Sequence, residues 1–128
     1  MRVDRGSTTV AMAAVVALLS AVVIMPTAVG VVLGARAQAT LAADAAALAA
    51  APATYPGASL VAPVVAARVM AKANGADLVS CRCRIDSSLR TRTVQVATRV
   101  TVEVPILGLL PIGATSRAEF DPQRWLGR

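Results

Sequence analysis

A long uncharged and apolar stretch near the N-terminus limits what this chain can fold into. No charged residue occurs from Gly6 to Ala35. The densest part, Val10–Ala35, would form a helix about 39 Å long, whereas the hydrocarbon core of a bilayer is about 30 Å thick. Its Val, Leu and Ile residues favour insertion by roughly 5 kcal/mol. We therefore expect residues 10–35 to form a transmembrane helix. A buried helix of a soluble protein is the less favoured alternative.

The basic residues around this stretch predict its orientation. Arg2 and Arg5 precede it, and Arg36 follows it. Because cytoplasmic flanks carry the excess of Lys and Arg, residues 1–9 should be a cytoplasmic, leader-like segment, and the rest of the chain should lie outside the cell membrane. A cleaved secretory signal is the alternative, since Ala35-Arg36-Ala37 fits an A-x-A cleavage site. The apolar run is, however, longer than the ~7–15 residues usual in such signals.

The helix should continue beyond the membrane as one surface for contact with other helices. Gly30 and Gly34 form a G-x-x-x-G pair, which permits close helix contact. Residues 36–51 form an Ala-rich, strongly helix-forming extension. Its narrow surface lets other helices approach closely, so we expect it to dock on partner proteins. A plain Ala-rich stalk is the alternative.

The remaining pattern predicts a second helix and three strands. Pro52, Pro56 and Gly57 should end the first helix, and the second should run from about Ser59 or Pro63 to Ala73. Alternating residues then predict a first strand, whose buried face carries Val79, Cys81, Cys83 and Ile85. A longer strand follows over 93–104, with its inner face formed by Val94, Val96, Val100, Val102 and Val104.

The C-terminal third is predicted to contain one more strand. Residues 105–113 read as an apolar loop, residues 114–120 as an edge strand, and residues 121–128 as a flexible tail from which Trp125 could dock. The fold class is therefore α+β: a long N-terminal transmembrane helix, a short second helix and a small antiparallel β-sheet. Residues 52–120 form a small extracytoplasmic domain, in a plan that resembles pilin-like proteins.

The two cysteines are not an ordinary disulfide or metal pair. Cys81 and Cys83 are one residue apart, too few for a thiolate cage and too close for a loop-closing disulfide. We favour small apolar core residues. A disulfide within the pair or between chains is the alternative.

The residue types argue against an enzyme. The chain has no His, which removes the commonest general base and most zinc sites. It also lacks a Gly-rich phosphate loop and a close pair of carboxylates. We therefore expect no catalytic residue, no cofactor and no metal.

The positive charge suggests a further class of partner. The formal net charge is +6, and arginines gather at positions 82, 84, 90, 92 and 99. No aromatic residue is interleaved with them, so the stacking part of a single-strand-binding surface is missing. A solvated basic strand face is favoured. The alternative function is a secreted or membrane-anchored, basic nucleic-acid-binding or DNA-uptake accessory protein.

One segment resembles a known family. The run Gln38–Ala51, QATLAADAAALAAA, is similar to the signature of TadE/TadG-like proteins of tight-adherence (Flp) pilus systems, with Gln38, Asp44 and Leu48 at the matching positions. The start of the chain and the segment Ala73–Leu78 resemble short TadE-like proteins of actinobacterial secretion loci. The resemblance implies a membrane-anchored, non-enzymatic minor pseudopilin or assembly factor that contacts other pilin-like proteins, as a homo- or hetero-oligomer. It also implies leader processing after Gly6 by a prepilin peptidase.

Overall fold

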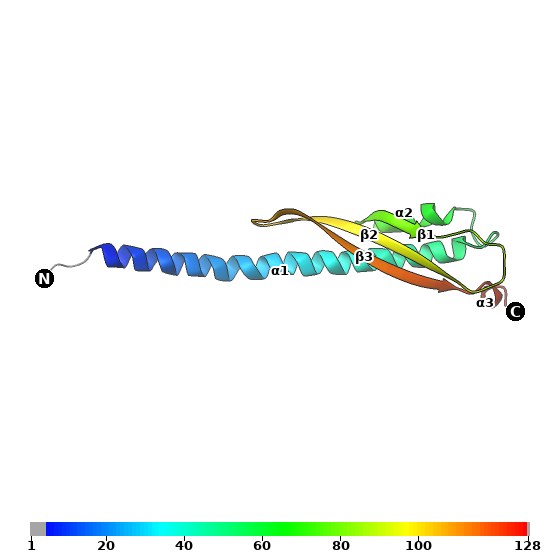
Figure 1. Cartoon of the computed structure of the whole chain (residues 1–128), viewed down its shortest axis with the longest axis horizontal. Coiled ribbons are helices and arrows are strands. Elements are labelled where there is room, and N and C mark those ends of the chain that lie inside the picture. The colour runs from blue at the N-terminus through cyan, green and yellow to red at the C-terminus, as the bar shows by residue number, and fades with distance from the viewer. Residues whose placement is uncertain (1–4, 128) are drawn as a thin grey trace.

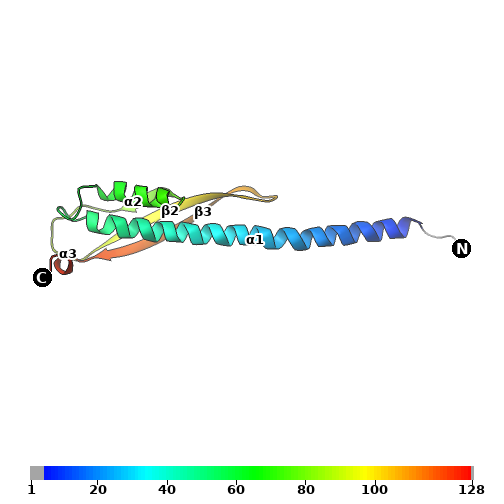
Figure 2. The ribbon, with the colours of Figure 1, turned by 180° about the vertical axis from the view of Figure 1, so that it is seen from behind.

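One very long helix carries a small domain on its C-terminal half. The structure is a computed structural model that describes residues 5–127. Figure 1 shows the N-terminal half of the helix extending away from the other elements, and Figure 2 shows the same arrangement from behind. In chain order the elements are α1 (Arg5–Ala53), α2 (Pro63–Ala73), β1 (Asp77–Arg82), β2 (Arg92–Val104), β3 (Gly108–Phe120) and α3 (Pro122–Trp125). The predicted α+β class and pilin-like layout are confirmed.

Helix α1 is a single element of 49 residues, in which the apolar stretch continues into the Ala-rich extension. It passes Pro26 without interruption and ends at Ala53, with Pro52 in its last turn. Helix α2 begins at Pro63, a residue whose fixed φ suits a first helical turn. It ends before Asn74, and Gly75 takes the left-handed conformation, with φ 73°, that commonly follows a helix.

The inner face of α1 is made of alanines that touch the rest of the domain. These side chains are buried at 0–4% exposure and comprise Ala35, Ala39, Ala42, Ala43, Ala46, Ala47, Ala50 and Ala51. They pack with alanines of α2 and with valines of the sheet. A methyl side chain lets helix and sheet approach closely, so the core needs few large side chains. This explains how a chain with 2% aromatic residues closes a domain.

Strand β2 is the central strand, in the order β1-β2-β3. Its predicted inner face is confirmed, because Val94, Val96 and Val104 are almost fully buried. Thr98 belongs to the same face, and its hydroxyl donates a hydrogen bond of 2.8 Å to the backbone carbonyl of Ala39. This bond satisfies the hydroxyl of Thr98, which is buried between sheet and helix.

Strand β3 is much longer than predicted. It pairs with β2 without a register shift, from Arg92 opposite Phe120 to Val104 opposite Gly108. The prediction of a loop over residues 105–113 is therefore wrong, since only 105–107 form the turn. The glycines and prolines of residues 105–113 are typical of a loop, and this is why a loop was predicted. Pro111 is tolerated because β3 is an edge strand, where a missing N–H need not break a ladder.

Strand β1 departs from the predicted alternation. Its pairing with β2 shifts directly after Leu78, and such a bulge changes which side chains face the core. Leu78 and Cys81 pack against the core, whereas Val79 is 51% exposed. The prediction that Val79 and Ile85 lie on the buried face is therefore wrong. Ile85 lies beyond the end of the strand and is exposed.

The C-terminal segment contains structure where a loose tail was predicted. Asp121 caps α3, its side chain accepting hydrogen bonds from the backbone N–H groups of Gln123 and Arg124. The ring of Trp125 lies 6.5 Å from that of Tyr55, between ring centroids. Helix α3 is thus placed beside the loop that follows α1.

Candidate functional site

The N-terminal half of α1 is an apolar surface that the domain leaves uncovered. Val10, Leu18 and Met25 are 71%, 68% and 73% exposed. Within residues 5–127, this is the one helix long and apolar enough to cross a membrane. Its length and composition fit a single-pass anchor or a signal sequence. Gly6 lies in its first turn, whereas residues 1–4 of the predicted leader-like segment lie outside the described residues.

Gly30 and Gly34 are open to approach. Both are exposed, and a Cβ atom added at either position would meet no atom within 4 Å. Each glycine exposes the helix backbone, so a second helix could come close at this point.

The two glycines begin a continuous exposed face that we call the outer stripe. Apart from the adjacent Leu33 and Gly34, its members follow one another at spacings of three or four residues, which places them on one side of a helix. The outer stripe consists of Gly30, Leu33, Gly34, Ala37, Leu41, Asp44 and Leu48. Its leucines are uncovered: Leu33, Leu41 and Leu48 are 61%, 65% and 68% exposed. In a small domain with so many buried alanines, these large side chains remain mostly exposed.

The three residues that resemble the family signature have different roles. Gln38 ties α1 to the end of α2, since its side-chain amide donates a 3.2 Å hydrogen bond to the carbonyl of Asn74. It also occupies the space where a Cβ of Gly75 would lie. Asp44 and Leu48 instead lie exposed on the outer stripe. Asp44 has no hydrogen-bond or ion-pair partner within the described part of the chain.

The segment of α1 from Gly30 to Ala51 has one face buried by the domain and one face exposed. The sequence led us to expect the whole surface from Gly30 to Ala51 to be available for partner helices. The structure corrects this, because the alanine face is covered by α2 and the sheet of the same chain. The outer stripe, on the opposite side, remains exposed. The residue types of the two faces differ, since the buried face holds only alanines, whereas Leu41, Asp44 and Leu48 lie on the outer stripe.

Cys81 and Cys83 are joined in a disulfide, with Cα atoms 5.3 Å apart. Cys83 is 9% exposed and belongs to the core, and Cys81 packs against it. The structure thus favours the alternative of a disulfide within the pair, in a site that is also apolar. Disulfides persist in oxidising compartments.

We expect this disulfide to contribute little stability. It closes a loop with one intervening residue, and the loop-entropy relation gives roughly 1.5 kcal/mol for so short a loop. The double variant Cys81→Val/Cys83→Val keeps the apolar contacts, so it should fold and lose about that amount. Urea unfolding of the full chain in detergent, with and without reductant, measures the difference. Failure of the double variant to fold would show that the disulfide is indispensable.

The arginines are used in two ways. Arg82, Arg99 and Arg117 are exposed on the strands. Arg92 is instead used inside the structure: its guanidinium donates to the backbone carbonyls of Asp86, Ser88 and Thr54. It also lies 5.8 Å from the centroid of the Tyr55 ring.

The loop that Arg92 holds has its own internal bonds. The backbone N–H of Ser88 donates a 2.8 Å hydrogen bond to the carboxylate of Asp86, and the Ser88 hydroxyl donates one of 2.9 Å. These bonds lower the pKa of Asp86 below its usual value, and the charges of Arg92 and Arg84 lower it further. The loop is therefore a structural unit of the domain.

Comparison of the chain with protein-family models, curated proteins and solved structures found no match. The family resemblance therefore rests on the residues of the sequence.

Sequence reasoning missed two parts of the exposed surface. Leu33 and Ala37 belong to the outer stripe, and a test for spacings of three and four residues starting from Gly30 would have found them. The second part is the turn between β2 and β3, which was interpreted only as an apolar loop. Its side chains are among the most exposed large apolar groups of the described chain.

Proposed function

We propose that this chain is a membrane-anchored, TadE-like minor pseudopilin or assembly component of a Flp/tight-adherence-type pilus or secretion system. It acts as a non-enzymatic protein whose long helix binds other pilin-like proteins. The observation that carries the proposal is the outer stripe, an exposed row of small and leucine side chains on α1 opposite the face that holds the domain. The resemblance of residues 38–51 to the TadE/TadG signature supports it.

The physical basis is close packing of helices. In a bilayer, lipid tails compete equally well for apolar surface, so helix association depends on how closely two helices fit. Gly30 and Gly34 allow that approach at the membrane end of the stripe. Leu41 and Leu48 lie outside the apolar run, where contact with a partner would remove them from water. One partner helix could therefore be held both within and beyond the membrane.

Single-pass anchoring with the domain outside the cytoplasm is part of this proposal. The basic residues before the helix favour this orientation. The disulfide between Cys81 and Cys83 supports it as well, because cytosolic thiols are kept reduced.

The double variant Gly30→Leu/Gly34→Leu tests the proposal. It should stay in the membrane, since leucine favours both helix and bilayer. It should no longer co-purify with the pilin-like proteins that accompany the wild-type chain, because leucine side chains hold the helices apart. Affinity purification from detergent-solubilised membranes, followed by mass spectrometry, compares the two.

The matched control is Ala14→Leu/Ala21→Leu. Ala21 lies nine positions, or about two and a half turns, before Gly30, so it is on the opposite face of the helix. Ala14 lies about two turns before Ala21 and shares its face. This control should recover partners as the wild type does. Equal recovery by the Gly30→Leu/Gly34→Leu variant would mean that the helix is only an anchor.

A further inference from the structure

The turn between β2 and β3 presents an unusually apolar surface, which we call the hairpin tip: Pro105, Ile106, Leu107, Leu109 and Leu110. Residues 104–114 include no polar side chain. Ile106 is 86% exposed, and Leu107 and Leu109 are each 73% exposed. Turns in water normally carry Gly, Asn, Asp or Ser. The composition of this turn is therefore not explained by the fold of the domain.

The backbone conformation of the hairpin tip is also unusual for its sequence. The N–H of Leu107 donates a 3.2 Å hydrogen bond to the carbonyl of Val104, which closes the turn. Pro105 takes the second position and Ile106 the third, with φ 74°. That position favours Gly, and a β-branched residue there is an outlier. Ile106 thus has a strained backbone conformation, and its side chain is not buried by the domain.

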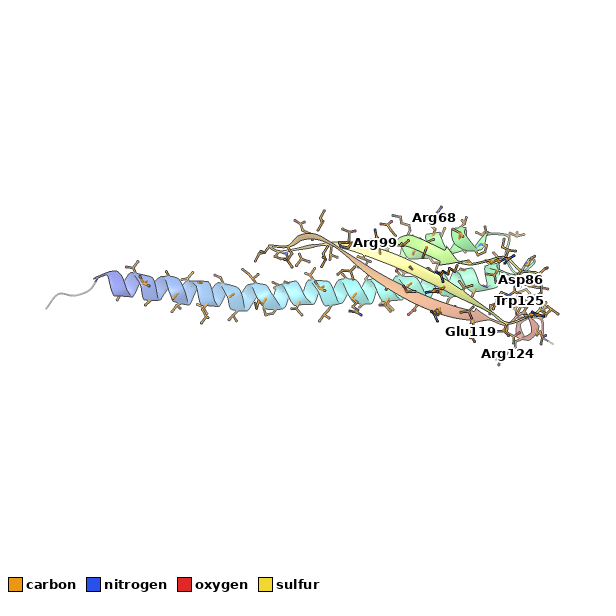
Figure 3. All side chains as sticks on the ribbon, viewed as in Figure 1. Arg68, Asp86, Arg99, Glu119, Arg124 and Trp125 are labelled. Atoms are coloured by element: carbon orange, nitrogen blue, oxygen red, sulfur yellow. A yellow bond between two sulfur atoms is a disulfide. The ribbon has the colours of Figure 1, made fainter. Side chains whose placement is uncertain are left out.

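The hairpin tip lies beside the apolar half of α1. Val104 and Leu107 line a shallow apolar hollow together with Ala28, Val32 and Leu33 of α1. Figure 1 shows the hairpin reaching along α1 toward the N-terminus, beyond β1 and α2. Figure 3 shows its side chains projecting around this end, far from Trp125 at the other end of the domain.

The charges at both ends of the apolar run locate the bilayer relative to the hairpin tip. Arg5 and Arg36 are separated by about 46 Å of helix, close to the ~40–45 Å thickness of a bilayer with its headgroups. Centred between them, a hydrocarbon core of about 30 Å covers roughly residues 11–30. Through Leu107, the hairpin tip shares a shallow hollow with residues 28, 29, 32 and 33 of α1. It therefore lies at the boundary between acyl chains and headgroups.

We propose that the hairpin tip inserts into the outer leaflet of the membrane that α1 spans, where Ile106, Leu107 and Leu109 contact lipid acyl chains. The inference rests on the proposed anchoring of α1. Lipid is what covers the hairpin tip, because the hairpin tip extends the exposed apolar surface of α1 at the same depth in the membrane. Of the next charged residues along the hairpin, Arg117 lies farther toward the domain, whereas Glu103 pairs with Leu109 in the β2–β3 ladder. Two contacts with the bilayer then fix how the domain, and with it the outer stripe, is turned relative to the membrane.

Tryptophan fluorescence of the full chain in vesicles tests the inference. The chain has one tryptophan, Trp125, so Trp125→Phe combined with Leu107→Trp moves the reporter to the hairpin tip. Both proteins are reconstituted in vesicles of phosphatidylcholine with a minority of phosphatidylglycerol, with or without bromine on the acyl chains. The reporter at position 107 should emit at shorter wavelength and lose most of its emission in brominated vesicles. The wild type, with Trp125 at the far end, should lose almost none.

Each outcome decides the inference. Flotation first shows whether the chain is bound to vesicles; a chain that does not float removes the anchor and the inference together. A chain that floats but whose reporter at position 107 is not quenched contradicts the inference alone. A reporter that is shielded from aqueous iodide yet not quenched by brominated lipid is covered by protein, such as a second copy, and also contradicts it. A second reporter, Trp125→Phe with Leu109→Trp, should repeat the lipid quenching on the other face of the hairpin.

Discussion

Replacing Ala46 with leucine should destabilise the domain by about 1–3 kcal/mol or more. Ala46 is 0% exposed and lies in the core with Ala50, Ala67 and Val96. Three additional heavy atoms have no space between α1 and the sheet, so the helix must move away or the leucine must adopt a strained rotamer. Urea unfolding of the full chain in detergent measures the loss.

The control for this prediction places the same change on the other face of the helix. Ala37 is exposed on the outer stripe, so Ala37→Leu should change the free energy of unfolding by less than about 0.5 kcal/mol. Equal destabilisation by Ala46→Leu and Ala37→Leu would show that the alanine face does not define the helix–sheet contact.

Two lysines in the apolar run should remove the chain from the membrane. Each lysine at the centre of a membrane helix costs about 2.5–3.5 kcal/mol, so Leu19→Lys with Val22→Lys exceeds the roughly 5 kcal/mol that favours insertion. Both residues are more than 60% exposed in α1, at 61% and 63%, so the domain itself is unaffected. Carbonate extraction should then release most of the chain.

A lysine at Thr40 provides the comparison. Thr40 lies on α1 beyond the apolar run and is exposed, so Thr40→Lys should leave the chain in the membrane fraction. Retention of the Leu19→Lys/Val22→Lys variant after carbonate would show that the apolar run does not hold the protein in the bilayer.

The parts of the fold that follow a strong period or a uniform composition could be predicted from the sequence. Helix α1 has only helix-forming or membrane-compatible residues over its length. Strand β2 alternates valines with polar residues, and the valines of its inner face were predicted, although the buried Thr98 on that face was not. Helix α2 was bounded by Pro63 and Gly75, whose backbone preferences suit a start and a stop.

The parts of the fold that were predicted wrongly depend on pairing between residues distant in the sequence. The N-terminal half of β3 is a strand because it faces β2, although its Gly and Pro content is typical of a loop. The bulge after Leu78 in β1 reverses which side chains face the core, and no residue of the local sequence indicates a bulge there. The position of the hairpin tip beside α1 follows from the length of the β2–β3 ladder. The candidate site could be predicted only in part, and only on α1, where Gly30, Gly34, Asp44 and Leu48 were named from the sequence.

The central claim is that α1 crosses a membrane and holds the folded domain on its outer side. Protease added to intact spheroplasts tests this directly. The domain should be digested, while a fragment containing the apolar run should remain in the membrane after carbonate washing. A domain that stays intact in spheroplasts but is cleaved once they are lysed would place it in the cytoplasm and contradict the claim.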